Sequence, residues 1–164
     1  MARAQRNAES RTLGVRTAVK RSHIQAVVKY LIDTCIIQAV LKREAGSDNL
    51  QIRIEAAQRG TLAVSALTAV EIWVGLARPR TPRSRKILFE NLLRHMRVLA
   101  FDEAAARQAY TVRRYLEQTG QEIGRMDPLI AAQAIVTGSV CVTDNLRHFL
   151  RIPGLVVENW LQPE

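Results

Sequence analysis

Short apolar runs alternate with longer amphipathic segments from about residue 28 onward. The runs at 28–32 and 140–142 are rich in aliphatic residues and too short for helices, which is typical of strands buried on both faces of a sheet. The segments between such runs carry apolar residues at helical spacing, and Gly60, Gly120 and Gly138 mark helix ends. Strands that alternate with helices predict an α/β fold: a parallel sheet of four to five strands flanked by helices in three layers.

The same pattern gives approximate bounds for each element. It predicts strands at residues 28–32, 62–65, 98–100, 140–142 and 155–157. It predicts helices at residues 36–42, 48–59, 68–76, 83–95, 103–119 and 128–137, with a short helical turn at 146–150. The two prolines within residues 78–82 predict a loop there, because proline lacks an amide donor and restricts its neighbours.

Residues 1–27 differ from the rest of the chain, because they are rich in Arg, Ala and Ser and lack apolar periodicity. Residues 1–29 contribute +6 of the net charge of +9, so the remainder is only mildly basic. Three interpretations are open: a disordered basic tail that touches nucleic acid or a partner, a transit-like peptide, or a start codon placed too early. We favour the first or the third and assign the folded domain to residues 28–164.

Composition narrows the class of protein further. The chain has 164 residues and 48% hydrophobic residues, enough for one domain with a sizeable core. It has no apolar run near the roughly 18 residues that span a bilayer, so we predict no membrane association. The two cysteines, Cys35 and Cys141, do not make a disulfide framework and are expected to be buried free thiols in a reducing cytoplasm.

Four acidic residues stand where predicted strands end or helices begin: Asp33, Glu71, Asp127 and Asp144. The carboxyl ends of parallel strands meet at one edge of the sheet, where ligands bind. Carboxylates gathered there repel one another unless a cation lies between them, and Mg²⁺ prefers oxygen ligands. The pattern therefore indicates a metal-dependent enzyme that acts on phosphate esters.

Each acidic position also has a purely structural interpretation. Asp33 and Asp127 could be N-caps of the helices that follow them. Glu71 could complete a capping box by reaching back to the amide of Thr68. Residues 143–145 could cap the short helical turn. Helix caps need not fall near three strand ends of one sheet, so the four positions together favour the metal site, although both interpretations remain open.

Several segments, in their order along the chain, resemble landmarks of the PIN-domain ribonucleases, and specifically of the VapC-like toxins of type II toxin–antitoxin systems. The resemblance covers roughly residues 28–160. The matching segments are 30–37, with the opening aspartate; 65–72, with the glutamate; 120–134, with the third acidic residue; and 142–149, 152–155 and 158–160 near the C-terminal end.

The resemblance implies a toxin that is an Mg²⁺- or Mn²⁺-dependent endoribonuclease, with Asp33, Glu71 and Asp127 as metal ligands, directly or through water. It implies an RNA substrate (tRNA, rRNA or mRNA), a cognate VapB-like antitoxin and a homodimer. The arginines that we expect to contact the RNA backbone are Arg78, Arg80, Arg83, Arg85, Arg125 and Arg147.

The chain also departs from the family pattern. Many members have asparagine where this chain has Cys35, and a soft thiol is a poor partner for Mg²⁺. The fourth metal-site position falls on Asn145, with Asp144 as a possible substitute ligand, and Thr143 is expected to orient a carboxylate or the phosphate. His148 lies close in sequence, but a metal mechanism does not require it as a general acid. These departures leave open a catalytically impaired PIN-like module that binds RNA or protein, and a metal-dependent DNA nuclease or phosphatase is a third hypothesis.

Overall fold

A five-stranded parallel sheet forms the centre of the computed structural model, which describes residues 27–162. The predicted extension therefore lies almost wholly outside the described residues. The strands are β1 (Tyr30–Ile32), β2 (Leu62–Ser65), β3 (Arg97–Leu99), β4 (Val140–Val142) and β5 (Val157–Glu158). The predicted parallel α/β sheet is thus confirmed, with all five strands present.

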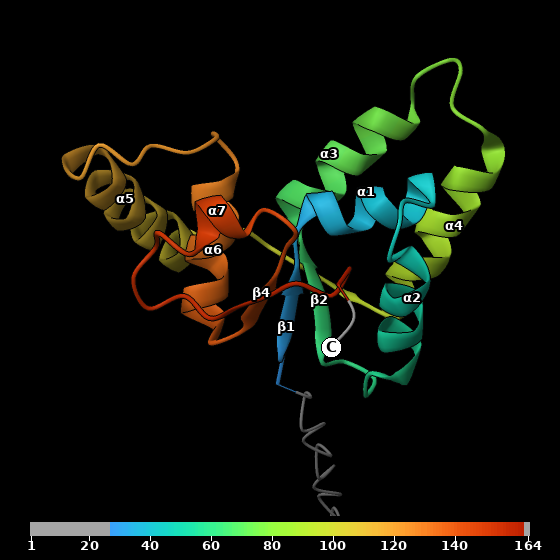
Figure 1. Ribbon diagram of the computed structural model, residues 1–164, viewed down its shortest axis with the longest axis horizontal. Helices are drawn as coiled ribbons and strands as arrows, with labels where there is room; N and C mark the ends of the chain where they lie inside the picture. Colours follow the sequence, from blue (N-terminus) through green and yellow to red (C-terminus); the bar gives the residue numbers. More distant parts are fainter. Residues whose placement is uncertain (1–26, 163–164) are drawn as a thin grey trace, which may run out of the picture.

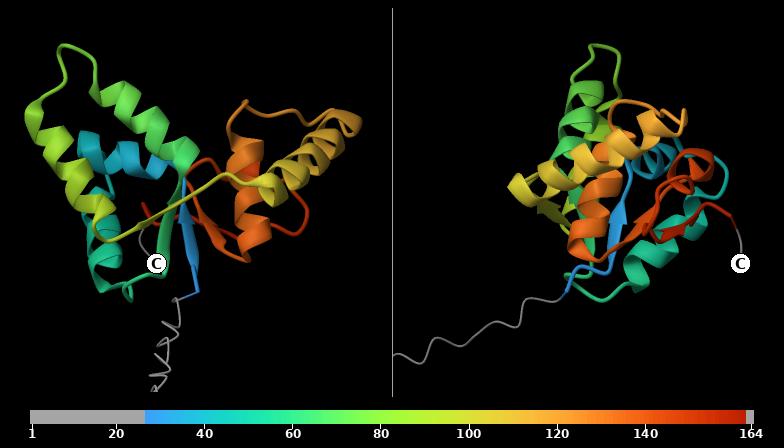
Figure 2. Two further views of the ribbon diagram at one scale, coloured as in Figure 1. Left: turned by 180° about the vertical axis from the view of Figure 1, so that it is seen from behind. Right: turned by 90° about the vertical axis from the view of Figure 1, so that its left-hand side faces the viewer.

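Seven helices cover the sheet on its two faces. They are α1 (Thr34–Lys42), α2 (Ser47–Ala56), α3 (Ala66–Leu76), α4 (Arg83–Leu93), α5 (Glu103–Gln118), α6 (Asp127–Thr137) and α7 (Leu146–Phe149). Helices α1–α4 lie on one side and α5–α7 on the other (Figure 1), and the view from behind in Figure 2 shows the same separation. No helix among residues 27–162 is both long enough and apolar enough to cross a membrane.

The order of the strands, β3-β2-β1-β4-β5, reverses at β1. The chain first builds outward from β1 through β2 to β3, then returns to the other side of β1 for β4 and β5. In the register, Ile32 lies opposite both Val64 and Val142, so the three central strands end at the same level. In open parallel sheets ligands bind outside the strand carboxyl ends at such a reversal. This topology places the residues that follow β1 and β4, beginning with Asp33 and Thr143, next to each other.

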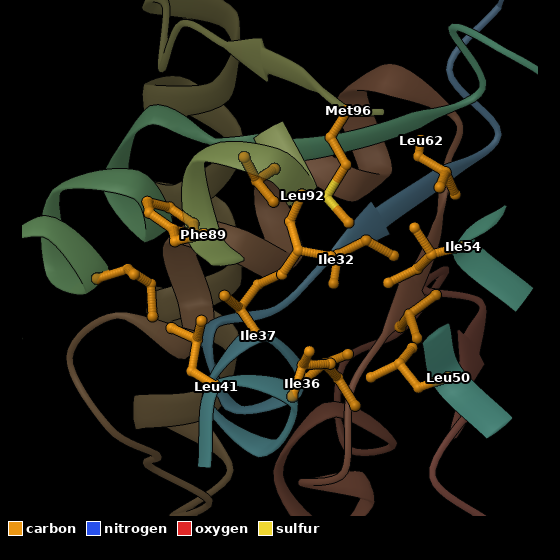
Figure 3. Close-up of a cluster of buried hydrophobic side chains, with 14 of the residues drawn as sticks. Ile32, Ile36, Ile37, Leu41, Leu50, Ile54, Leu62, Phe89, Leu92 and Met96 are labelled. Carbon is orange, nitrogen blue, oxygen red and sulfur yellow. The ribbon is translucent and has the colours of Figure 1, made fainter. Parts of the chain in front are cut away.

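Alternation along the strands divides the core into two apolar clusters. On β1, Ile32 packs toward α1–α4, whereas Leu31 packs toward α5 and α6. Figure 3 shows the first cluster, in which side chains from β1, α1, α2 and α4 converge. Its members at the centre of this packing include Ile32, Ile36, Ile37, Leu50, Ile54, Phe89 and Leu92. The two clusters therefore pack against β1 from both faces of the sheet, directly beside the site.

Three strands differ in their bounds from the sequence-based prediction. The predicted strand 98–100 is β3 at Arg97–Leu99, because Arg97 already pairs with Ala63 of β2. The predicted strand 155–157 is β5 at Val157–Glu158, because Gly154 adopts a left-handed conformation with φ of 78° and the amide of Leu155 closes a turn onto Ile152. The first strand begins at Tyr30 and not at Val28, because the carbonyl of Val28 accepts a hydrogen bond from the Ser139 side chain.

We predict that Phe89→Ala lowers the free energy of unfolding by about 3–5 kcal/mol, because the ring of Phe89 is fully buried and its loss leaves a cavity. Ile87→Ala on the same helix is the matched control, since Ile87 is 53% exposed. Urea denaturation followed by circular dichroism measures both. Equal losses for the two variants would contradict this description of the core.

Candidate active site at the carboxyl ends of the central strands

Asp33 follows β1 directly and is only 5% exposed. It is the N-cap of α1, as one of the two interpretations predicted, and its Oδ1 accepts a hydrogen bond from the amide of Thr34 at 2.7 Å. Its Oδ2 accepts two more, from Thr143 Oγ1 at 2.8 Å and from Cys35 Sγ at 3.1 Å. A helix cap needs only one of these bonds, so the carboxylate is held far more tightly than capping requires.

Burial raises the pKa of the Asp33 carboxyl above its ordinary value. The hydrogen bonds from Cys35, Thr143 and Thr34 favour the ionised form and oppose this effect, whereas the negative charge of Asp127 adds to it. The net effect is a raised pKa for the Asp33 carboxyl. An ionised Asp33 is therefore costly by itself, and a bound cation would remove that cost.

Glu71 reaches the same region from α3. Helix α3 begins at Ala66 and is capped by Ser65, whose Oγ accepts from the amide of Leu67 at 3.1 Å. Thr68 therefore lies inside the helix, and the predicted capping box between Thr68 and Glu71 is wrong. Glu71 instead turns toward α1, where its Oε2 accepts a hydrogen bond from Thr34 Oγ1 at 2.7 Å.

Asp127 is the first residue of α6, and its carboxylate makes no capping bond there. The prediction that it is an N-cap is wrong. Asp127 Oδ2 lies 3.0 Å from Asn145 Nδ2 and 2.7 Å from His148 Nδ1, both on the segment that follows β4. Asn145 and His148 are three residues apart at α7, so they present their side chains on the same side.

The two candidates for the fourth position have different surroundings. The carboxylate of Asp144 is exposed and accepts a hydrogen bond from Asn159 Nδ2 at 2.8 Å. The side-chain amide of Asn145 donates to Asp127, and its backbone N–H donates to Thr143 Oγ1 at 3.0 Å. The structure thus joins Asn145, and not the side chain of Asp144, to the acidic group. Asn145 is the N-cap of α7 by position but makes no side-chain capping bond.

Cys35 belongs to this hydrogen-bonded group. Besides donating to Asp33, its Sγ lies 3.3 Å from Thr143 Oγ1 and accepts from the amide of Asp144 at 3.3 Å. Burial, and then the charge of Asp33, raise the pKa of the Cys35 thiol to about 12. Near neutral pH the thiol keeps its proton, and the S–H group orients Asp33 Oδ2. Cys35 and Cys141 are both free, as predicted, and only Cys141 is fully buried.

The donor set fits a hard, hydrated cation. Asp33, Glu71 and Asp127 offer carboxylate oxygens, which suit Mg²⁺ or Mn²⁺. Within residues 27–162, no three Asp, Glu, His or Cys groups converge closely enough to hold an ion by themselves. An ion here would consequently keep several water ligands, as Mg²⁺ commonly does in proteins.

Comparison with known proteins agrees with this arrangement. The profile of the PIN domain family matches residues 30–155. The chain belongs to the PIN domain family. The chain is 31% identical to Ribonuclease VapC2 of Haemophilus influenzae, over 82% of its own length and 100% of the relative's. It is 28% identical to the tRNA(fMet)-specific endonuclease VapC of Shigella flexneri, over 82% of its own length and 99% of the relative's.

A solved structure shares the fold over nearly its whole length. In VapBC2 from Rickettsia felis, bound to a DNA fragment from its promoter, the matching chain is 28% identical. The TM-score is 0.68, with coverage of 80% of this chain and 98% of that chain. The fold and the relatives together place this PIN domain among the VapC-like proteins.

Sequence reasoning missed two polar residues of this PIN domain's site. Thr34 joins Asp33 to Glu71, because its amide binds one carboxylate and its hydroxyl the other. His148 has no required role in the sequence-based prediction, yet its Nδ1 lies 2.7 Å from Asp127 Oδ2. The spacing of three residues places Asn145 and His148 on the same side of a helical turn, which could have indicated a shared partner. That the partner is Asp127 follows only from the packing of α7 against α6. Trp160 and Phe149 take no part in the site, because each is buried in one of the two apolar clusters.

We predict that Asp33→Asn raises Tm at pH 7 by about 2–5 °C in EDTA, because it removes a buried negative charge beside Asp127. The folded-state pKa of Asp33 is raised, so its ionised form costs stability at neutral pH, and this cost disappears as the pH falls toward the ordinary carboxyl value. The gain in Tm should shrink accordingly below neutral pH. Differential scanning fluorimetry across pH measures it.

The control for this experiment is Asp144→Asn, which removes the same charge from an exposed position and should change Tm little. A variant Asp33→Asn that is less stable than the wild type at pH 7 would show that the hydrogen bonds of the carboxylate outweigh its burial.

Proposed function

We propose that this PIN domain is the toxin of a type II toxin–antitoxin system and cuts RNA internally by metal-assisted hydrolysis. The observation that carries the proposal is the buried Asp33 carboxylate, fixed by three hydrogen bonds where the strand order reverses. A structural cap has no need of such burial, whereas a metal ligand must be held in one orientation. The names of the relatives, VapC ribonuclease and endonuclease, support the same activity.

Each acidic residue has a distinct role in this proposal. Asp33 and Asp127 would hold Mg²⁺, with Mn²⁺ as a substitute, and Glu71 would hold it directly or through water. A bound ion would lower the pKa of a coordinated water and neutralise charge on the scissile phosphate. Thr143 keeps Asp33 Oδ2 in place, and Thr34 orients Glu71. Asn145 steadies Asp127 through its amide, while Asp144 would be at most an outer ligand.

Exposed arginines would bind the RNA backbone. Arg78, Arg80, Arg83 and Arg85 are exposed in and after the loop that joins α3 to α4. Arg125 precedes Asp127, and Arg147 lies next to His148; both are also exposed. Such contacts position a substrate without reading its sequence. Among the RNA classes, tRNA is the first to test, since one relative is named for a tRNA.

The alternative, an impaired module that binds RNA or protein, depended on Cys35 and Asn145. Both side chains make hydrogen bonds to the acidic group, Cys35 to Asp33 and Asn145 to Asp127. Neither removes a carboxylate from the site. We therefore favour the active enzyme over the binding module.

We predict that Asp33→Asn and Asp127→Asn each lower the rate of RNA cleavage by about a hundredfold or more, because each removes a carboxylate that would hold the ion. Labelled tRNA, rRNA fragments, mRNA and DNA of equal length are incubated with the purified chain in Mg²⁺, Mn²⁺ or EDTA. Discrete RNA fragments that require the metal are the expected result.

Asp144→Asn is the matched control and should retain most of the activity, since its carboxylate binds Asn159. Metal binding without cleavage of any RNA would favour the binding module. Preferential cleavage of DNA would favour a DNA nuclease.

The antitoxin would cover a groove between α1, α3 and the loop after α3. This cavity has a volume of about 530 Å³. It is lined by apolar side chains such as Ile72 and Val74 and includes Glu71 on its wall. A segment of a VapB-like antitoxin that filled the groove would reach the acidic site, and a basic side chain on it could pair with Glu71. One of the solved structures that the chain resembles, VapBC2 from Rickettsia felis, is a toxin–antitoxin complex, which supports this occupant.

We predict that Val74→Asp weakens binding of the co-expressed antitoxin by about tenfold or more, because it places a charge in the apolar part of the groove. The matched control is Ile52→Asp on α2, because Ile52 is 64% exposed and Val74 is 62% exposed. Calorimetry measures the affinity for the antitoxin, and RNA cleavage by the free variant should be unchanged.

The homodimer is tested by light scattering on the free chain. The exposed Trp73 on α3 offers contact area for it.

A further inference from the structure

Three polar atoms meet where α7 approaches the start of α6. Asp127 Oδ2 lies 2.7 Å from His148 Nδ1 and 3.0 Å from Asn145 Nδ2, and these two nitrogens lie 2.6 Å apart. The three atoms therefore form a closed triangle in which every edge is hydrogen-bond length. The triangle joins a carboxylate, an amide and an imidazole at the proposed metal site.

While the carboxyl group of Asp127 is ionised, protons alone cannot satisfy all three edges of this triangle. If Nδ1 of His148 carries a proton and donates it to Asp127, then two donors face each other on the edge between His148 Nδ1 and Asn145 Nδ2. If Nδ1 is bare and accepts from Asn145, two lone pairs face each other between His148 and Asp127. Rotating the Asn145 amide by half a turn exchanges its oxygen and nitrogen, but then the edge to Asp127 joins two acceptors. Each arrangement leaves one edge unfavourable.

A cation over the triangle would satisfy every corner at once. With the Asn145 amide rotated, the corners become a carboxylate oxygen, an amide oxygen and an imidazole nitrogen, all of which are metal ligands. Ligand bonds of about 2.1 Å in an octahedral site put neighbouring ligand atoms about 3.0 Å apart. The observed edges of 2.6–3.0 Å are close to that spacing.

We propose that His148 is a direct ligand of the divalent metal through Nδ1, in one set with Asp127 and Asn145, and that its imidazole shifts the preference of the site from Mg²⁺ toward first-row transition ions. The inference rests on the metal-dependent function proposed above and deepens it. Mg²⁺ takes oxygen ligands, whereas transition ions bind mixed nitrogen and oxygen sets with higher affinity.

The position of His148 favours this role over that of a mobile surface residue. Its amide donates to the carbonyl of Asn145 at 3.0 Å, which keeps both residues on one turn. The next residue, Phe149, is fully buried in the second apolar cluster and anchors that turn. The imidazole side chain is only 34% exposed. The charge of nearby Asp33 adds to the attraction for a cation at this place.

The test is electron spin-echo spectroscopy of Mn²⁺ bound to the purified full chain, at about pH 8, where an ordinary imidazole is neutral. A histidine ligand gives a nitrogen modulation that changes when the chain is labelled with ¹⁵N-histidine. We expect this modulation in the wild type, its loss in His148→Gln, and its retention in His95→Gln. His95 is exposed at the end of α4 and makes a matched control.

Calorimetric titration with Mn²⁺ and with Mg²⁺ gives the second readout. The ratio of the two affinities should favour Mn²⁺ by about tenfold in the wild type and should fall toward one in His148→Gln but not in His95→Gln. The labelled wild-type spectrum needs no substitution, so the inference stays testable even if His148→Gln fails to fold.

Binding of Mn²⁺ with no histidine modulation in the wild type would overturn the inference, and would mean that His148 only pairs with Asp127. RNA cleavage by the same preparation would then still support the proposed ribonuclease. A wild type that binds no Mn²⁺ would also overturn the inference. In that case, the cleavage assay decides separately whether the proposed function falls with it.

Discussion

The burial of one carboxylate, that of Asp33, is the constraint around which the site of this PIN domain is organised. It lies at the end of the central strand, where the order of the sheet reverses, and desolvation raises its pKa. Three donors keep it in one orientation: the Thr34 amide, the Cys35 thiol and the Thr143 hydroxyl. The sheet, the start of α1 and the segment after β4 must all be in place before these donors can meet, so the fold and the site depend on the same contacts.

The buried carboxylate of Asp33 lowers the stability of the fold and at the same time favours the binding of a cation. A buried negative charge near a second one is unfavourable, and proteins keep such groups mainly where function requires them. Here the surrounding framework compensates, because the two apolar clusters hold β1 on both faces. Helix α1 carries Asp33 and Thr34 at its start and buries Ile36 and Ile37 one turn later. The rigid packing of that turn holds the carboxylate against repulsion from Asp127.

Departures from the family pattern are compatible with this framework. Cys35 acts as a hydrogen-bond donor and keeps its proton, so a soft side chain is accommodated beside a hard-ligand site. Asn145 contributes a neutral group beside Asp127, which adds no negative charge to a crowded region. His148 brings an imidazole to the same place. The site thus contains three carboxylates, an amide and an imidazole, which offer both oxygen and nitrogen ligands to a cation.

The α/β class, the five strands to within a few residues of their bounds, and the acidic positions after β1, on α3 and at the start of α6 all follow from the amino-acid sequence alone. Periodicity and strand-end position depend only on local order along the chain, which is why they could be read directly. The chain could not reveal whether Glu71 bonds to Thr68 or to Thr34, or that Asn145 and His148 meet Asp127. Those choices depend on how α1, α3, α6 and α7 pack against one sheet. Side-chain partners that are distant in sequence are set by that packing, so they become known only from the folded chain.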